Sequence, residues 1–200
     1  FDIATDAHPD DVRALFDNCR LIGRRFRLAH IRFGREIIEV ATFRSTVNDK
    51  ENDNNVVHDS DGRILRDNLY GKIDDDVWRR DFTCNALYYS IGDCSISDYV
   101  RGIEDIRQRK LRLIGEPDRR LREDPVRMLR AIRFAVKLDF LIDEEIKESI
   151  INNRKLLSNV PRARLFDEFL KLFQSGNAYK TFLFLNKFKL FEILFPETAE

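Results

Sequence analysis

The tripeptide Gly115-Glu116-Pro117 divides the sequence into two parts with different patterns of apolar residues. After it, every predicted element is a helix: one starts at Asp124-Pro125 and runs to 138, one is capped by Asp143, one covers 161–175 and ends at Gly176, and one covers 178–188. Before it, strands are predicted at 1–4, 25–33, 37–43, 97–100 and 111–114, with helices after His8-Pro9 and over 74–89. The sequence therefore predicts an α+β fold, with a head over residues 1–115 and an all-helical neck over 116–200.

One internal segment shows neither the helical nor the strand periodicity of apolar residues. Residues 45–63 are polar and include the run Asn48-Asp49-Lys50-Glu51-Asn52-Asp53-Asn54-Asn55. Such a composition cannot bury enough apolar surface to offset the entropy of ordering the chain. We expect this segment to be a loop that is disordered until substrate arrives.

The composition argues against two classes of protein. The 35 basic and 35 acidic residues cancel, whereas a free-standing, nonspecific nucleic-acid binder usually carries a basic excess. No apolar run approaches the roughly 20 residues of a membrane span, so no membrane partner is expected. Cys19, Cys84 and Cys94 lack the spacing of metal ligands and are expected to be reduced, buried apolar residues. The chain is predicted to be cytoplasmic.

Two carboxylates in predicted strands are candidate metal ligands. Asp2 and the position two residues before it would share one face of the first strand, and two such carboxylates can hold paired magnesium ions for phosphoryl transfer. Glu39 interrupts the apolar strand Ile37-Ile38-Glu39-Val40, where an unpaired charge is costly to bury. From the residues alone, a solvated strand-end aspartate and a salt-bridged or rim-facing glutamate remain the alternatives.

The stretch Arg79-Arg80-Asp81-Phe82-Thr83-Cys84-Asn85-Ala86 groups polar and charged residues. Asp81 and Asn85 are four residues apart and share a face of the predicted helix, next to Arg79 and Arg80. Arginines can bind phosphate oxygens with two hydrogen bonds, so the set could hold triphosphate and ribose hydroxyls. An internal cluster of salt bridges is the alternative.

The stretch Glu123-Asp124-Pro125-Val126-Arg127-Met128-Leu129-Arg130 opens the first neck helix. Asp124 is a natural N-cap, which would explain it without any chemistry. Arg127 and Arg130 project from the first turns, so a carboxylate acceptor lies beside a guanidinium donor. This pair complements the amino group and the ring nitrogen of adenine, but cytosine offers the same order of groups. The pair alone therefore does not separate ATP from CTP.

In this order and spacing, the four stretches resemble the class II tRNA nucleotidyltransferase/poly(A) polymerase family of the polymerase β superfamily, over essentially all 200 residues. Asp2 matches the second aspartate of the family's Asp-x-Asp metal motif, and Glu39 matches its third carboxylate. The stretch 79–86 matches the ribose and phosphate motif, and Glu123-Asp124-x-x-Arg127 matches the base-recognition motif. Arg164 and Glu168 match a motif that supports base recognition.

A further segment resembles the poly(A) polymerase branch of this family. Residues 24–30 contain the pattern Arg-Arg-Phe-x-Leu-x-His, and CCA-adding relatives usually lack the leucine and the histidine. The family's Gly-Gly loop, its first metal-binding aspartate and its basic C-terminal region are not within residues 1–200. We therefore expect the head to be incomplete at its N-terminal end and the neck at its C-terminal end.

The resemblance implies a polymerase β-like head with a mixed sheet, and an enzyme that adds AMP from ATP to RNA 3′ ends. It implies that Asp2 and Glu39 hold Mg²⁺. It also implies that the nucleotide is bound by Arg79, Arg80, Asp81, Asn85, Asp124, Arg127 and Arg130. The expected partners are ATP and RNA 3′ ends. A CCA-adding enzyme and a noncatalytic RNA- or nucleotide-binding relative remain the alternatives.

Overall fold

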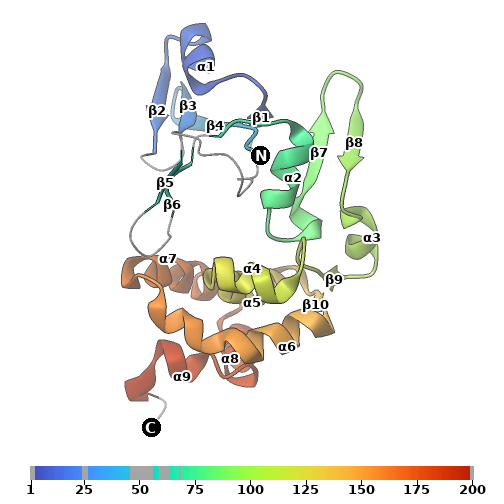
Figure 1. Cartoon of the computed structure of the whole chain (residues 1–200), viewed down its shortest axis with the longest axis vertical. Coiled ribbons are helices and arrows are strands. Elements are labelled where there is room, and N and C mark those ends of the chain that lie inside the picture. Colours follow the sequence, from blue (N-terminus) through green and yellow to red (C-terminus); the bar gives the residue numbers. More distant parts are fainter. Residues whose placement is uncertain (1–2, 24–26, 46–55, 59–63, 68, 199–200) are drawn as a thin grey trace. The chain divides into compact units, whose positions relative to one another are not determined.

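The computed structural model describes residues 3–23, 27–45, 56–58, 64–67 and 69–198, with the backbone alone for the two shortest ranges. The chain divides into two compact units, Phe1–Arg79 and Arg80–Glu200. The fold class is confirmed: a mixed sheet lies in the first unit, and most of the second unit is helical (Figure 1). The predicted boundary at residue 115 lies inside the second unit.

The first unit is built around a four-stranded sheet. Its elements are β1 (Ile3–Thr5), α1 (Pro9–Leu15), β2 (Cys19–Ile22), β3 (Leu28–Phe33), β4 (Glu36–Thr42), β5 (Val56–His58), β6 (Ile64–Asp67) and α2 (Ile73–Arg79). The strand order is β1-β4-β3-β2, in which β1 runs parallel to β4 and the other pairs are antiparallel. Gly34, with φ of +61°, makes the predicted turn between β3 and β4.

Alternation along the strands creates a small core beneath α1. Ala29 and Ile31 of β3 are 1% and 4% exposed, and Val12 of α1 packs with them. Pro9 opens α1 as predicted, but the helix ends at Leu15. Cys19, predicted as part of the helix's apolar stripe, instead begins β2. Its side chain still faces the same core, which is why the helical periodicity was misleading.

The loop predicted over 45–63 falls mostly on residues outside the described ranges. Within the described part of this segment, β5 pairs with β6 in an antiparallel hairpin, with Val56 opposite Asp67. The loop prediction is therefore wrong for residues 56–58.

The backbone between this hairpin and α2 lies close to the segment that follows β4. The Gly71 amide donates to the Phe43 carbonyl at 2.9 Å, and the Ser45 amide donates to the Leu69 carbonyl at 3.0 Å. A Cβ atom on Gly71 would lie 2.7 Å from the Ser45 nitrogen, so only glycine fits.

The second unit is mainly helical. Its elements are the 3₁₀ turn η1 (Thr83–Asn85), β7 (Leu87–Ser90), β8 (Ser95–Asp98), α3 (Gly102–Arg107), β9 (Lys110–Leu111), α4 (Pro117–Glu123), α5 (Val126–Leu138), β10 (Leu141–Ile142), α6 (Glu144–Asn153), η2 (Arg154–Asn159), α7 (Arg162–Phe173), α8 (Ala178–Lys187), α9 (Phe191–Leu194) and η3 (Pro196–Thr198). β7 and β8 form a hairpin, and β10 pairs in parallel with β9. The expectation of helix alone after residue 117 is thus wrong at β10.

The helix predicted over 74–89 is confirmed as far as Arg79 and is wrong beyond it. α2 ends at Arg79, and the chain continues through η1 into β7. Phe82 is fully buried and forms a bridge with Leu113, and the Thr83 amide donates to the Arg112 carbonyl at 3.0 Å. These contacts span about thirty residues of sequence, and they override the local helical pattern.

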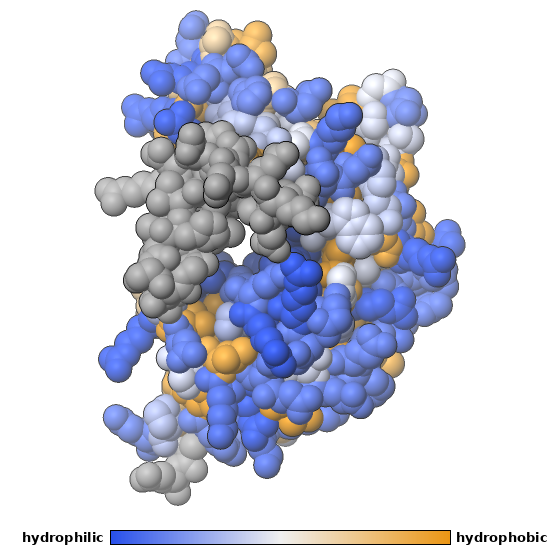
Figure 2. Space-filling model, in the orientation of Figure 1, coloured by the Kyte–Doolittle hydropathy of each residue, from blue (hydrophilic) through white to orange (hydrophobic). Residues whose placement is uncertain are grey.

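Helix α5 forms the centre of the second core. Met128, Leu129 and Ile132 are completely buried, and α5 packs against α4, α7 and α8. Figure 2 shows mainly hydrophilic side chains over α4, which covers part of this core. No helix within the described ranges combines the length and apolar character needed to cross a membrane.

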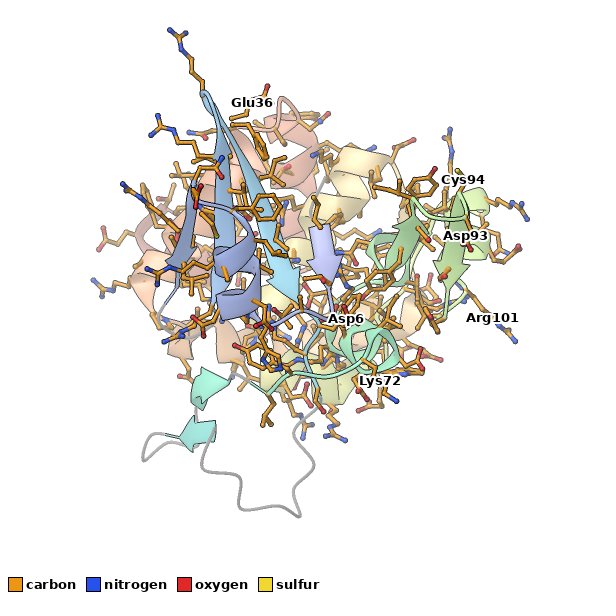
Figure 3. The ribbon with its side chains drawn as sticks, turned by 90° about the horizontal axis from the view of Figure 1, so that it is seen from above. Asp6, Glu36, Lys72, Asp93, Cys94 and Arg101 are labelled. Atoms are coloured by element: carbon orange, nitrogen blue, oxygen red, sulfur yellow. The ribbon has the colours of Figure 1, made fainter. Side chains whose placement is uncertain are left out.

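The cysteines differ in exposure. Cys19 is buried, and burial raises the pKa of the Cys84 thiol to about 11. Cys94 is exposed, contrary to prediction, because it occupies the turn of the β7–β8 hairpin beside Asp93 with φ of +55° (Figure 3).

Candidate nucleotide-binding site

Asp124 lies at the junction of α4 and α5. Pro125 follows it, and α4 ends because Asp124 adopts an extended conformation, with φ of −147° and ψ of 93°. The N-cap of α5 is Pro125 and not Asp124 as predicted, but Asp124 Oδ1 still accepts a hydrogen bond from the Val126 amide, in the first turn of α5, at 3.2 Å. Its Oδ2 accepts from Nη2 of Arg164, on α7, at 2.6 Å. Asp124 therefore joins the start of α5 to α7.

Arg127 and Arg130 project from the first turns of α5 toward the same carboxylate. Arg127 Nε donates to Asp81 Oδ1 at 2.8 Å, and Arg130 Nε donates to Asp81 Oδ2 at 2.5 Å. Arg127 Nη1 also donates to the Arg120 carbonyl at 2.8 Å. The side chains of Arg127 and Asp81 are 11% and 15% exposed, so the pair is largely removed from water.

The electrostatics favour the charged form of Asp81. Burial raises the pKa of this carboxyl, but the charges and hydrogen bonds of Arg130 and Arg127 outweigh burial and hold it below its ordinary value. Asp81 is therefore a carboxylate at neutral pH, and it balances two arginine charges.

A second carboxylate, which belongs to α7, lies beside the arginines of α5. Glu168 is 5% exposed, and its Oε2 lies 3.2 Å from Arg133 Nε. Its Oε1 accepts from Lys171 Nζ at 3.1 Å and lies 4.0 Å from Arg130 Nη1. Arg130 thus lies between two carboxylates, Asp81 and Glu168.

Arg80 and Asn85 are fixed by local contacts. Arg80 Nε donates to the Tyr88 hydroxyl at 2.8 Å, and its Cζ lies 4.8 Å from the centre of the Tyr88 ring. Asn85 Oδ1 accepts from the Phe82 amide at 3.2 Å. Because η1 replaces the predicted helix, Asp81 and Asn85 do not share a helix face: Asp81 contacts α5, and Asn85 contacts its own turn.

The remaining predicted residues belong to the first unit. Arg79 ends α2 and donates to the Ser45 carbonyl. Glu39 stands in the middle of β4 with 52% of its side chain exposed, and its Oε1 lies 3.1 Å from Nε2 of His30, directly opposite on β3. Asp2 lies outside the described residues. In the part of the chain that is described, no three His, Cys, Asp or Glu side chains gather as a metal site.

Sequence reasoning missed one buried group that supports the stretch 79–86. Asp105, on α3, is completely buried, and its Oδ2 accepts from the Thr83 hydroxyl at 2.6 Å. Arg112 Nη1 lies 3.0 Å from its other oxygen. Asp105 lies between the strands predicted at 97–100 and 111–114, where no element was predicted, and it gave no local signal because its partners come from other segments.

Two family models and several curated relatives match this chain. The family described as "Poly A polymerase head domain" matches residues 1–112, and the family described as "Probable RNA and SrmB- binding site of polymerase A" matches residues 139–200. "Poly(A) polymerase I" of Salmonella typhimurium is 54% identical over 98% of this chain and 42% of its own length. That of Haemophilus influenzae is 53% identical over 98% and 44%. The chain thus spans less than half the length of these curated relatives.

More distant likenesses extend to CCA-adding enzymes. The "CCA-adding enzyme" of Bacillus subtilis is 35% identical over 96% of this chain and 46% of its own length. Among solved structures, the CCA-adding enzyme of Bacillus stearothermophilus in complex with CTP is 30% identical, with a TM-score of 0.77, over 94% of this chain and 42% of that one. A tRNA nucleotidyltransferase complexed with a primer tRNA and an ATP analog, 23% identical over 96% of this chain and 52% of that one, has a TM-score of 0.73 and supports the fold alone.

Proposed function

Because the chain belongs to the family of poly(A) polymerase head domains, we propose that it is the catalytic part of a polynucleotide adenylyltransferase. In this proposal it adds AMP from ATP to RNA 3′ ends without a template, in mRNA polyadenylation and RNA processing or decay. The observation that carries the proposal is a difference in identity. The "Poly(A) polymerase I" relatives are 52% to 54% identical, whereas the "CCA-adding enzyme" relatives are 33% to 35% identical.

In the second unit, Asp124 and Arg127 are proposed to read the adenine. A carboxylate has about four acceptor sites, so Asp124 can accept the adenine amino group while it keeps its bonds to Val126 and Arg164. Arg127 would donate to the adenine ring nitrogen through the part of its guanidinium that does not bind Asp81. The structure supports this pairing because both side chains are held at the start of one helix, α5.

The ribose and the triphosphate are proposed to be bound by Arg79, Arg80, Asp81, Asn85 and Arg130. Arginine suits phosphate because its planar guanidinium donates two parallel hydrogen bonds. The contacts of Arg80 with Tyr88, and of Asn85 with Phe82, limit the rotamers of both side chains before a ligand binds. Such preorganisation lowers the entropy lost on binding.

We further propose that Asp2 and Glu39 hold Mg²⁺. The residues fit the ion in kind, because Mg²⁺ prefers carboxylate oxygens and the Glu39 side chain is half exposed. Ile3 is aligned with Val40 in the parallel pair of β1 and β4, and the proposal requires this register to continue by one position, from Asp2 to Glu39. When bound, the ion would activate the RNA 3′-hydroxyl and neutralise the triphosphate. His30, close to Glu39, would orient the carboxylate.

RNA 3′ ends are the proposed macromolecular substrate. This rests on the description of the family that matches residues 139–200, which names RNA. We also propose that the chain divides into a head over 1–115 and a neck over 116–200. A cytoplasmic location, where such RNA and ATP are present, is proposed as well.

The test offers the full-length protein each of the four nucleoside triphosphates with a generic RNA primer and Mg²⁺. We expect extension with ATP and little with the other three. Incorporation of CTP before ATP would favour a CCA-adding enzyme, which the likeness to the CTP complex makes the second candidate. No incorporation of any nucleotide would favour a noncatalytic relative.

A further inference from the structure

We infer that Asp105 is a positioning residue for the nucleotide, which acts through the hydroxyl of Thr83 on the side-chain amide of Asn85. The inference rests on the proposed function, because Asn85 is one of the residues proposed to bind the ribose and the triphosphate. All three residues belong to the second unit: Thr83 and Asn85 lie on η1, and Asp105 lies on α3.

The turn η1 is held through three atoms of Thr83. Its amide donates to the Arg112 carbonyl at 3.0 Å, and its hydroxyl donates to Asp105 Oδ2 at 2.6 Å. Its carbonyl accepts from the Ala86 amide at 3.2 Å, and a Cβ atom on Gly102, the first residue of α3, would lie 2.2 Å from that oxygen. The hydroxyl bond belongs to the side chain and the other contacts to the backbone, so a substitution can remove the hydroxyl bond by itself.

The acceptor of the Thr83 hydroxyl is itself fixed in place. Asp105 is completely buried, and Arg112 Nη1 lies 3.0 Å from its Oδ1. Arg112 Nε donates in turn to Asp143 Oδ2 at 3.1 Å, at the start of α6. An apolar side chain of similar volume would avoid the cost of burying this charge, but it would leave the hydroxyl without a strong, oriented acceptor.

The orientation of Thr83 determines where Asn85 points. Asn85 Oδ1 accepts from the Phe82 amide at 3.2 Å, so Nδ2 takes no part in that bond. Because the amide group is planar, a fixed Oδ1 also sets the direction of Nδ2, which can donate to a ribose hydroxyl or a phosphate oxygen. Phe82 and Asn85 flank Thr83, so a turn that loosens at Thr83 changes this direction. A donor that is already oriented lowers the entropy lost when the nucleotide binds.

The test is the variant Thr83→Val in the full-length protein, with kcat and KM measured for ATP in primer extension. Valine keeps the shape of threonine and removes the hydroxyl. We expect kcat/KM to fall about tenfold or more, as for loss of a hydrogen bond to a charged group. Thr83→Ser keeps the hydroxyl and should restore kcat/KM to within about threefold of the wild type.

The matched control is Thr181→Val. Thr181, on α8, is 1% exposed, and its hydroxyl donates to the Leu172 carbonyl at 3.4 Å. This variant also removes a buried threonine hydroxyl and should lower the free energy of unfolding, but kcat/KM should stay within about twofold when measured well below Tm. Loss of stability in Thr83→Val with unchanged kcat/KM would overturn the inference, because it would leave Asp105 only a structural role.

The route through Asn85 is tested by combining substitutions. In an Asn85→Ala background, Thr83→Val should reduce kcat/KM by no more than about a further twofold, because residues that act as a unit are not additive. A full tenfold further loss would show that Thr83 acts on another group and would overturn the inference.

A second variant applies if Thr83→Val does not fold. Asp105→Asn keeps the shape but weakens the acceptor, and the hydroxyl can then turn to the Arg112 carbonyl, 3.5 Å away. A smaller fall in kcat/KM, about fivefold, is therefore expected. A folded Asp105→Asn with the kcat/KM of the wild type would overturn the inference.

A further measurement does not depend on turnover. The side-chain amide resonances of Asn85 in NMR spectra should shift in Thr83→Val and stay unchanged in Thr181→Val. If the wild-type protein transfers no nucleotide, the proposed function fails, and these resonances still decide whether Thr83 orients Asn85. Unchanged resonances of Asn85 in Thr83→Val, with an active wild type, would overturn the inference and leave the proposed function intact.

Discussion

The variant Glu168→Gln tests whether the buried carboxylate beside α5 stabilises the fold by its charge. Glu168 is 5% exposed, and three cationic side chains lie within 4.0 Å of its oxygens: Arg130, Arg133 and Lys171. Glutamine has nearly the same shape, so the change creates no cavity. It does leave Arg133 without its compensating charge, whereas Arg130 keeps its ion pair with Asp81, and we expect the protein to lose stability.

The magnitude follows from the exposure of the partners. Removing one member of a buried ion pair costs about 3–5 kcal/mol. The Lys171 side chain is 55% exposed, so its share is that of a surface pair, at most about 1 kcal/mol. Arg133 and Arg130, at 17% and 28%, keep some contact with water and place the loss at the low end of the range, about 3 kcal/mol. For a chain of this length, that loss lowers Tm by about 6–12 °C.

The assay is urea and thermal unfolding of the wild type and Glu168→Gln. Glu148→Gln, an exposed residue on α6, is the matched control, and its free energy of unfolding should stay within about 0.5 kcal/mol of the wild type. A loss below about 1 kcal/mol for Glu168→Gln would refute the reasoning, because it would place the carboxylate among weak surface pairs.

Three further predictions address other parts of the chain. Glu39→Gln should abolish Mg²⁺-dependent AMP transfer in primer extension without lowering Tm. The control Glu36→Gln, on the same strand (Figure 3), should remain active. Turnover near the wild type in Glu39→Gln would assign Glu39 to structure. Gly102→Ala should destabilise the protein by about 3 kcal/mol or more in urea unfolding, because its Cβ would lie 2.2 Å from the Thr83 carbonyl oxygen, whereas Gly92→Ala should be nearly neutral; equal effects would contradict this close approach. For Asp143, burial raises the pKa, but hydrogen bonds from Lys110 and Arg112 outweigh burial and lower the pKa. The contribution of Asp143 to stability is therefore present above its pKa in the unfolded chain, about 3.9, and is lost as the pH falls through its pKa in the folded protein. The stability difference between the wild type and Asp143→Asn should therefore narrow below about pH 3.9, and a difference that widens on acidification would show the opposite sign.

The helices of the neck could be predicted because their limits depend on local groups. Asp143 caps α6 through the Glu145 amide, and Gly176 follows α7 with φ of +81°. The segment around η1 could not be predicted in this way, because its conformation depends on the burial of Phe82 and on its bridge to Leu113, about thirty residues away. β5 was missed because its strand pairing is not visible in a polar segment.

The same distinction applies to the candidate site. The spacing of Asp124 and Arg127 predicted that both residues lie at the start of one helix, and the structure places them there. It did not predict their partners: Arg164 for Asp124 and Asp81 for Arg127, each about forty residues away or more. The four-residue spacing of Asp81 and Asn85 even indicated a wrong arrangement, since it assumed a helix that tertiary contacts prevent.

These partners explain how α5 can carry so much charge in a protein core. Arg127, Arg130 and Arg133 follow one another at three-residue intervals on a helix whose other side is fully buried, and without acceptors their charges would oppose both helix formation and packing. The acceptors come from outside the helix: Asp81 precedes η1, and Glu168 belongs to α7. The bonds that make α5 stable therefore also determine where its arginines point. It follows that a substitution at either carboxylate should disturb stability and arginine orientation together, whereas an exposed acidic residue on the same helices should affect neither.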